Sequence, residues 1–445
     1  MSLVFGMSCA SKRTEPLLPG QRGADRTEQI RASLDSSRPR NVILLIGDGM
    51  ADSEIAMARN YYVGAAGHLN LDNLPLAGDI TTYAVEEEDP NVPDYVPDSA
   101  STATAWSTGR KTSDRRIGTS ALTDKPLQNI IELAQKKGLR VGNVTTADIT
   151  DATPAGAAAH VSHRKCADPE NMQNCPQYRK AAGGLGSIAE QLVDHKIDVL
   201  LGGGRETLGR KIDAGPHAGR TVIESAKLQG YRVAYDASEL QSVTSLSGGP
   251  ILGLFAEEHF TPEWRGDPAR LYPCSGPQNC VTGQRPPQQP TLAAMTRKAL
   301  ELLENDAGFF VQIEGALIDR CAHSADPCGQ IGATIDFDEA VAVAVSYAAA
   351  RGDTLVIVTA DHGHGSQVVD WLDDENHSPG LCTRLITREG AELRVVYASN
   401  VPPRIQQHTG VQVRVAAQGP RAANVLGLND QTELFYIITS ALGLQ

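Results

Sequence analysis

Several short motifs combine carboxylate and imidazole side chains at spacings that suit metal binding. In EGALIDRCAH, Asp319 and His323 lie four positions apart, so a helix would present both on one face. In TADHGHGS, Asp361 and His362 are adjacent and His364 follows. Zinc accepts carboxylate oxygens and imidazole nitrogens, and an outer hydrogen bond usually orients its ligands, a role open to His364. A solvated Asp–His pair on a helix and a surface turn are the simpler alternatives for these motifs.

A second group of candidates offers mainly oxygen. Asp48 stands between two glycines in IGDGMADSE, and Asp151 and Thr153 share the motif TDATPAG. Glu314 closes an apolar run and would point to the same place. A carboxylate with a nearby hydroxyl suits magnesium, which binds oxygen and keeps several waters. Each motif also fits an ordinary turn or a helix N-cap. His408 stands alone in the motif HTG. A lone histidine is more often a structural residue than a metal ligand.

The stretch DYVPDSASTATAWSTGRK carries six hydroxyl residues between Ser99 and Thr108, separated mostly by small side chains. Pro97 and Asp98 break the incoming chain, so Ser99 falls at the start of a helix, where free N–H groups favour negative charge on its oxygen. Ser99 is therefore the candidate nucleophile, and the later hydroxyls are expected to serve packing. Arg164, in HVSHRKC, offers a planar fork that binds two phosphate oxygens at once. A surface arginine beside a disulfide loop is the alternative.

The elements that must position these residues are visible as apolar runs. Five runs rich in aliphatic or β-branched residues stop at or near a glycine or an acid: 41–46, 140–146, 197–201, 309–313 and 354–359. Helix-like segments occur at 126–137, 186–195, 291–305 and 336–351. Continuous apolar runs suit strands that are buried on both faces. This alternation predicts an α/β fold with a large central, mostly parallel sheet and helices on both of its faces.

Four of these runs have carboxylates or histidines at or just beyond their C-terminal ends. Open parallel sheets bind ligands at the carboxyl ends of their strands, so residues far apart in the chain could meet in one active site at that edge. We expect residues 1–40 to form an N-terminal arm and residues 41–445 to form a single domain. Insertions are expected near 205–290 and 370–405, where glycine, proline and glutamine are frequent.

Composition restricts the kind of partner. The 445 residues include 53 acidic and 40 basic side chains, for a net charge of -13, and no basic tract, which argues against nucleic-acid binding. No apolar run reaches the roughly 18 residues that a membrane-spanning helix needs. Such a protein would repel an anionic substrate unless local positive charge reverses the field.

The eight cysteines lie partly in loop-like sequence, which favours disulfides and an oxidising compartment over scattered reduced thiols. The first residues, MSLVFGMSCA, contain an apolar stretch before Ser8 and Cys9. These residues fit either the remnant of a secretion signal or a lipid anchor at Cys9. The missing basic flank and the short apolar run argue against an ordinary signal peptide.

Taken together and in order, the motifs resemble those of bacterial periplasmic alkaline phosphatases. The resemblance rests on NVILLIGDGM, PDYVPDSASTATAWSTG, TDATPA, HVSHRKC, EGALIDRCAH, TADHGHGSQ and HTG, with support from LLGGGRETL and NVLGLNDQTELFY. It implies a phosphomonoester hydrolase with two zinc ions and one magnesium, periplasmic or secreted, and homodimeric. It also implies that a serine attacks phosphorus in line and forms a phosphoserine, which water then hydrolyses.

The resemblance implies a role for each candidate. Ser99 would be the nucleophile, and Arg164, held by Asp98, would bind phosphate. The implied metal ligands are Asp48, Asp361 and His362 for one zinc, Asp319, His323 and His408 for the other, and Asp48, Asp151, Thr153 and Glu314 for magnesium, with His364 bracing Asp319. The metal ions and the arginine would outweigh the carboxylates, which removes the expected repulsion of a phosphate dianion.

The sequence departs from this family pattern near its second zinc motif. Position 320 is Arg, where the best-known relative has Lys, and position 322 is Ala, where that relative has Asp. We expect Arg320 to remain cationic and to contact phosphate through water, which would tighten product binding and slow turnover. The loss of an acid at Ala322 would weaken the repulsion of anions.

The resemblance also implies the disulfides Cys166–Cys175 and Cys280–Cys328. The remaining cysteines, which allow three pairings, are Cys9, Cys274, Cys321 and Cys382.

Other metal-dependent enzymes of the same superfamily are the main alternatives. A sulfatase needs a Cys/Ser-x-Pro-x-Arg motif, which the sequence after Ser99 lacks. A phosphodiesterase needs room for a second ester arm, and a phosphomutase is a further possibility. A phosphate- or metal-binding protein without catalysis would have no need of Ser99.

Overall fold

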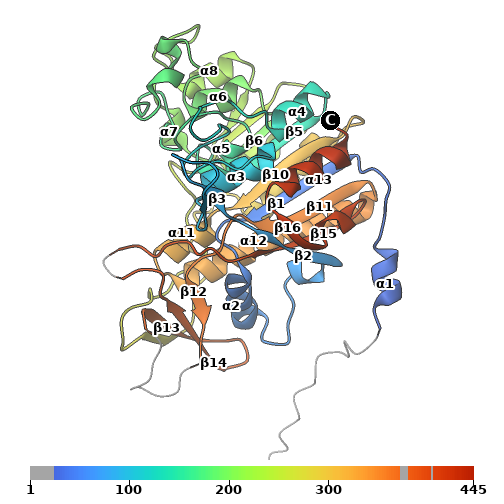
Figure 1. The fold of residues 1–445 in the computed structure, drawn as a ribbon, viewed down its shortest axis with the longest axis vertical. Coiled ribbons are helices and arrows are strands. Elements are labelled where there is room, and N and C mark those ends of the chain that lie inside the picture. The colour runs from blue at the N-terminus through green and yellow to red at the C-terminus, as the bar shows by residue number, and fades with distance from the viewer. Residues whose placement is uncertain (1–24, 371–378, 402–403, 445) are drawn as a thin grey trace, which may run out of the picture.

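The computed structural model describes residues 25–370, 379–401 and 404–444. Its centre is a ten-stranded sheet with the order β16-β2-β15-β11-β1-β10-β5-β6-β8-β7 (Figure 1). The strands are β1 (Asn41–Gly47), β2 (Leu76–Thr81), β5 (Arg140–Asp148), β6 (Val199–Gly203), β7 (Arg232–Ala234), β8 (Ile251–Leu254), β10 (Phe309–Gly315), β11 (Thr354–Ala360), β15 (Val413–Gln418) and β16 (Gly427–Asp430). Only β15 runs antiparallel to its neighbours within this sheet. The expected mostly parallel sheet is therefore confirmed.

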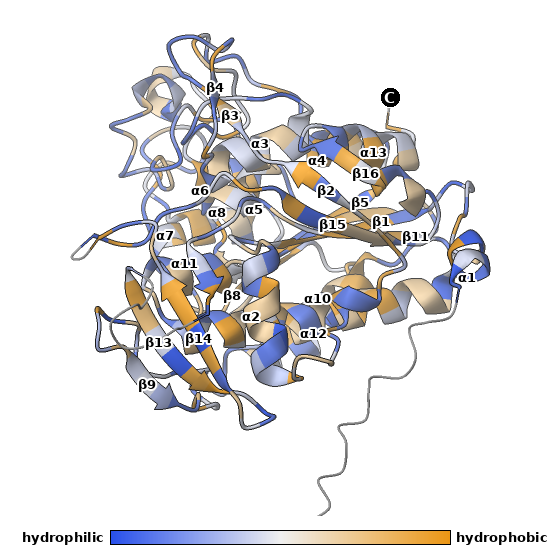
Figure 2. Ribbon diagram, turned by 60° about the horizontal axis from the view of Figure 1, so that its bottom comes forward, coloured by the Kyte–Doolittle hydropathy of each residue, from blue (hydrophilic) through white to orange (hydrophobic). Residues whose placement is uncertain are grey.

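Helices cover both faces of this sheet (Figure 2). On one face lie α10 (Leu292–Leu303) and α12 (Pro327–Arg351). The other face carries α3 (Ser99–Thr108), α4 (Ile130–Lys136), α5 (Ala152–Gly156) and α13 (Glu433–Leu442). The remaining helices are α1 (Thr27–Ala32), α2 (Asp52–Tyr62), α6 (Ile188–Asp194), α7 (Arg205–Leu208), α8 (Val222–Leu228), α9 (Ala237–Ser242) and α11 (Leu317–His323). No helix of the described part of the chain is long and apolar enough to cross a membrane.

The central strands β1, β10 and β11 are buried along their whole length, as their apolar runs predict. The long helix α12 begins earlier than the expected segment 336–351. Pro327 occupies its first turn and the Asp326 side chain accepts a hydrogen bond from the Gly329 N–H, so both residues favour a helix start at this point. Its first half is buried, so it lacks the polar face by which a surface helix is recognised.

The range 205–290, expected to be an insertion, includes β7 and β8, which extend the main sheet at one edge. These strands have only three and four residues, too few to stand out from the surrounding Gly- and Pro-rich sequence. A second, four-stranded sheet is made by β9 (Ser275–Gln278), β12 (Ser366–Val368), β13 (Leu381–Ile386) and β14 (Glu392–Tyr397). A short pair, β3 (Ala84–Val85) and β4 (Pro93–Asp94), completes the strands of the described residues.

Three disulfides join described cysteines. The expected pairs Cys166–Cys175 and Cys280–Cys328 are both present. A third bond, Cys274–Cys382, ties the residue before β9 to β13 and so fastens the small sheet. Cys321 is a buried free thiol. Cys9 lies outside the described residues.

Candidate active site

Three adjacent strands deliver carboxylates to one edge of the main sheet. In the register of β1, Gly47 pairs with Ala360 of β11 and with Gly315 of β10. Asp48 directly follows β1 and Asp361 directly follows β11, so the two residues lie side by side. Glu314 is near the end of the neighbouring strand β10. Gly49 follows with φ +65 and donates its N–H to Asp361 Oδ1 at 2.8 Å. A side chain at this position would be strained and would press on Asp319.

The first ligand cluster consists of Asp48, Asp361 and His362. His362 Nε2 lies 3.1 Å from Asp361 Oδ2 and 3.6 Å from Asp48 Oδ1. Burial, and then the charge of Asp361, raise the pKa of Asp48 well above its usual range. Burial also raises the pKa of Asp361 to about 6 and lowers that of His362. Buried carboxylates so close together repel one another and favour a cation between them.

The second cluster brings together Asp319, His323, His364 and His408. Asp319 lies 3.2 Å from His323 Nε2, 3.4 Å from His364 Nε2 and 3.5 Å from His408 Nε2. Asp319 and His323 share one face of α11, as their spacing predicts. The ring of His408 stacks on that of His362 with centroids 3.6 Å apart, which places the two clusters next to each other.

Backbone carbonyls orient the imidazoles of the second cluster. His408 Nδ1 donates to the Pro97 carbonyl at 3.0 Å, and His323 Nδ1 donates to the Gln406 carbonyl. The two Nε2 atoms then face each other at 3.2 Å. A carbonyl bound to one ring nitrogen fixes the tautomer and leaves the other nitrogen free for a cation, which is the usual arrangement of metal-binding histidines.

The donor set fits metal ions. Asp48 Oδ1, Asp319 Oδ1 and Asp361 Oδ2 are buried and have no hydrogen-bond partner among the described residues. Buried carboxylate oxygens are costly to leave unpaired, and here they are combined with imidazole nitrogens. Carboxylate and imidazole are the oxygen and nitrogen ligands that zinc binds.

Ser99 is the first residue of α3 and is 3% exposed. Its hydroxyl lies 3.3 Å from His362 Nε2 and so borders the first cluster. Asp98 caps the helix by accepting from the N–H groups of Ala100 and Ser101. The hydroxyl therefore sits at the positive end of a ten-residue helix, where an oxygen anion is favoured.

Most of the other hydroxyls of α3 have hydrogen-bond partners, which fits the packing role expected of them. Thr102 donates to the Asp98 carbonyl, Thr104 to the Arg116 carbonyl and Thr108 to the Thr104 carbonyl. The helix packs so closely on α5 that a Cβ at Gly156 would lie 2.4 Å from that of Ala103.

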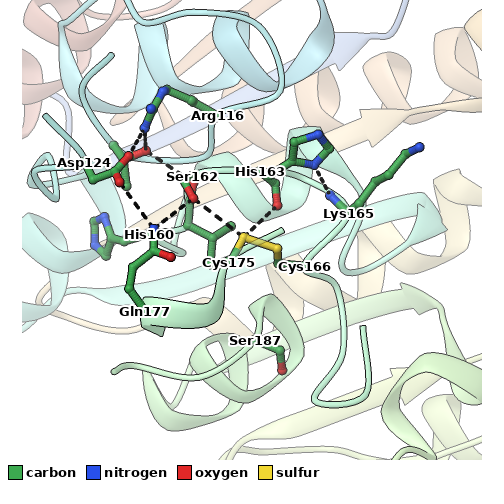
Figure 3. Close-up of a disulfide and its surroundings, with 12 residues drawn as sticks. Arg116, Asp124, His160, Ser162, His163, Lys165, Cys166, Cys175, Gln177 and Ser187 are labelled. Carbon is green, nitrogen blue, oxygen red and sulfur yellow. Dashed lines mark hydrogen bonds and ion pairs between the residues drawn. A yellow bond between two sulfur atoms is a disulfide. The ribbon is translucent and has the colours of Figure 1, made fainter. Parts of the chain in front are cut away.

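Arg164 lies between two carboxylates. It donates to Asp98 Oδ2 at 3.1 Å and to Asp151 Oδ1 at 2.7 Å. Its segment is held by the Cys166–Cys175 disulfide, and Figure 3 shows this bond beside His163, the residue that precedes the arginine. The arginine is thus aimed at the space around Asp98 and Asp151 rather than at solvent.

The carboxylates of the oxygen-rich candidates lie near enough to Asp48 for their charges to raise its pKa further. Asp151 caps α5, and Thr153 is buried in its first turn. Glu314 accepts a short hydrogen bond from Thr145, and burial raises the pKa of this carboxyl to about 8. Burial opposes ionisation of Asp151, but Arg164, His259 and Arg320 outweigh it and lower the pKa to about 2. Arg320 Nη1 lies 3.4 Å from Asp151 Oδ2 and is partly exposed.

His259 borders this site and is absent from the sequence-based candidates. Its Nδ1 accepts the Asp148 N–H at 3.0 Å and lies 4.0 Å from Asp151 Oδ2. Burial and then the charge of Arg320 lower the pKa of His259 to about 4, so the ring is neutral. Like the ligands, it follows a strand of the main sheet, β8, but that strand has only four residues.

The comparisons with known proteins agree with this geometry. A profile of the alkaline phosphatase family matches residues 39–399 and 383–444. An alkaline phosphatase of Escherichia coli K12 is 48% identical over 429 residues, which cover 95% of this chain and 90% of that protein. A streptomycin-6-phosphate phosphatase of Streptomyces griseus is 49% identical over 416 residues, 91% of each chain.

Solved structures show the same fold. The alkaline phosphatase of the Antarctic bacterium TAB5 matches with a TM-score of 0.69 and 25% identity, over 92% of this chain and 99% of that one. The Thermus thermophilus enzyme matches with a TM-score of 0.67 and 22% identity, over 94% of each chain.

The chain belongs to the alkaline phosphatase family. It is a hydrolase of phosphoric monoesters.

Proposed function

We propose that this enzyme hydrolyses phosphomonoesters through a phosphoserine at Ser99, with two zinc ions and one magnesium. The observation that carries the proposal is the position of Ser99. Its buried hydroxyl stands at a helix N-terminus, 3.3 Å from His362 Nε2 in the first ligand cluster. A nucleophile needs a group or charge that favours its ionised form, and this position supplies one.

The two clusters are the proposed zinc sites. Asp48, Asp361 and His362 would hold one ion, and Asp319, His323 and His408 the other, with His364 bracing Asp319. Magnesium would bind among Asp48, Asp151, Thr153 and Glu314. When bound, the ions supply positive charge that favours ionised oxygens and offsets the charge of the phosphoryl group.

The chemistry consists of two displacements at phosphorus. In the first, the bond between Ser99 Oγ and phosphorus forms while the ester bond breaks and the alcohol leaves. In the second, water attacks the phosphoserine, the serine–phosphorus bond breaks and inorganic phosphate is released. Arg164 would bind two phosphoryl oxygens in its planar fork, and Asp98 would keep that fork oriented.

A comparison of esters tests the substrate class. Because Arg164 and the metal clusters converge on the phosphoryl oxygens, a second ester arm would displace favourable contacts. We expect kcat/KM for p-nitrophenyl phosphate to exceed that for bis(p-nitrophenyl) phosphate by at least roughly 10³-fold. Equal or reversed values would favour the phosphodiesterase alternative. p-Nitrophenyl sulfate, measured beside them, tests the sulfatase alternative in the same way.

Arg320 is proposed to contact phosphate through water. Its side chain is 42% exposed and lies beside Asp151, so its charge contributes only modestly to the binding of phosphate. In Arg320→Ala we expect the inhibition constant for inorganic phosphate to rise about two- to fivefold. Arg297→Ala, an exposed arginine on α10, is the matched control. An unchanged inhibition constant in Arg320→Ala would exclude the proposed contact.

The remaining proposals concern assembly and location. The relatives that are 47–49% identical come from bacteria, and the three disulfides suit an oxidising compartment, which supports a periplasmic or secreted enzyme. We propose a homodimer with an N-terminal arm, residues 1–40. In its described part, α1 has no buried residue and stands away from the sheet (Figure 1). Cys9, the proposed position of a lipid anchor, lies outside the described residues.

A further inference from the structure

A third cluster of metal-binding side chains lies outside the active site. Among the described residues, three groups bring such side chains together, and two of them are the clusters described above. The third comprises Glu132, His160 and His195, whose ligand atoms all lie within 4.8 Å of one another. They come from α4, from the loop after α5 and from the end of α6, respectively.

The geometry around His160 leaves one ring nitrogen for a metal ion. Its Nδ1 donates to the Gly118 carbonyl at 2.8 Å, and its Nε2 lies 2.9 Å from Glu132 Oε1. Since a carbonyl oxygen only accepts, Nδ1 carries a proton, and Nε2 is the nitrogen that faces Glu132. A metal ion would bind Nε2, while the bond to Gly118 keeps the ring oriented, as is usual for histidine ligands.

Glu132 is positioned independently of the histidine. It is the third residue of α4 and forms a capping box, in which its Oε2 accepts the Asn129 N–H at 3.0 Å. Its Oε1 is therefore the oxygen that faces His160. The carboxylate is 26% exposed, so an ion can reach it from solvent.

Glutamine side chains of α6 and α4 hold the backbones of the two histidines. Gln191 of this helix accepts the His160 N–H at 2.8 Å and donates to the His160 carbonyl at 3.0 Å. Gln135 of α4 donates to the His195 carbonyl at 2.6 Å. The three candidate ligands are thus held together before any ion binds, which lowers the cost of ordering them.

We propose that Glu132, His160 and His195 form a structural zinc site that ties α4 and α6 to the loop leading to Arg164. Tetrahedral zinc, with ligand bonds of about 2.0–2.2 Å, separates its ligand atoms by about 3.3 Å. Glu132 Oε1 and His160 Nε2, 2.9 Å apart, are close to this spacing, and the ligand atom of the partly exposed His195 lies within 4.8 Å of both. Water would fill the fourth position.

Zinc binding to the full-length enzyme tests the site. The active site is first saturated with zinc and magnesium, and further zinc is then measured by equilibrium dialysis and elemental analysis. We expect wild type to bind one more zinc per chain. His195→Ala should weaken this binding by more than about 100-fold, because losing a mere hydrogen-bond partner of a ligand costs about 10–100-fold. Glu132→Gln, which keeps an oxygen for the helix cap, should do the same.

His217→Ala, a histidine elsewhere on the chain, is the matched control and should bind zinc like wild type. The added zinc should also raise the melting temperature of wild type and His217→Ala but not of His195→Ala, since only a ligand that binds the folded state stabilises it. Activity of the loaded enzyme should be unchanged in His195→Ala. The proposal is overturned if wild type binds no additional zinc, or if the additional zinc survives both ligand substitutions.

Discussion

In Ser99→Ala, kcat for p-nitrophenyl phosphate should fall by roughly 10³- to 10⁶-fold, the range expected when a covalent nucleophile is removed. The zinc and magnesium content should stay that of wild type, because Ser99 lies beside the clusters and is none of the proposed ligands. The fall should be in kcat rather than in phosphate affinity, since the phosphoryl-binding groups remain.

Ser107→Ala is the matched control, because this buried serine lies on the same helix but outside the site. It should retain nearly full activity. A Ser99→Ala enzyme that loses its metals would make the serine a structural residue, and one that keeps near-normal turnover would exclude it as the nucleophile. Elemental analysis and steady-state kinetics on the same samples separate these outcomes.

Removal of the metal ions should have an effect of similar size. Five carboxylates lie close together in and beside the clusters: Asp48, Asp151, Glu314, Asp319 and Asp361. Without the ions, those that remain ionised would repel a phosphate dianion, and the charge stabilisation of the transition state would be lost. We expect a strong chelator to lower activity by at least about 10³-fold, consistent with the several kcal/mol that bound metals supply.

Readdition experiments identify the ions. Zinc together with magnesium should restore activity, whereas magnesium alone should not, because the histidine-containing clusters favour zinc. Chelator saturated with zinc beforehand should leave the enzyme active. Full turnover in the metal-free protein would refute the proposed chemistry, and recovery with magnesium alone would refute the assignment of zinc.

Much of the site could be predicted because its residues directly follow strands. Asp48 and Asp361 come one residue after apolar runs, and parallel neighbours such as β1 and β11 end together. Asp319 and His323 could be paired from their helical spacing. His408 had no such signal, and only its resemblance to a family motif indicated a role.

Other features are invisible in the sequence for physical reasons. The strands β7 and β8 are too short to show a pattern, and so His259, which follows β8, gave no sign of its place beside Asp151. The bond Cys274–Cys382 spans 108 residues, and no spacing rule could select it among three pairings. The cluster of Glu132, His160 and His195 depends on the packing of two helices and a loop.

The central claim is that the phosphoryl group passes through Ser99 in two displacements. It is tested most directly by the stereochemistry at phosphorus, followed when the metal-loaded enzyme transfers the phosphoryl group from an isotopically chiral phosphomonoester to an acceptor alcohol. Each in-line displacement inverts the configuration, so a phosphoserine route must give net retention. Net inversion would show a single direct displacement and would contradict the account.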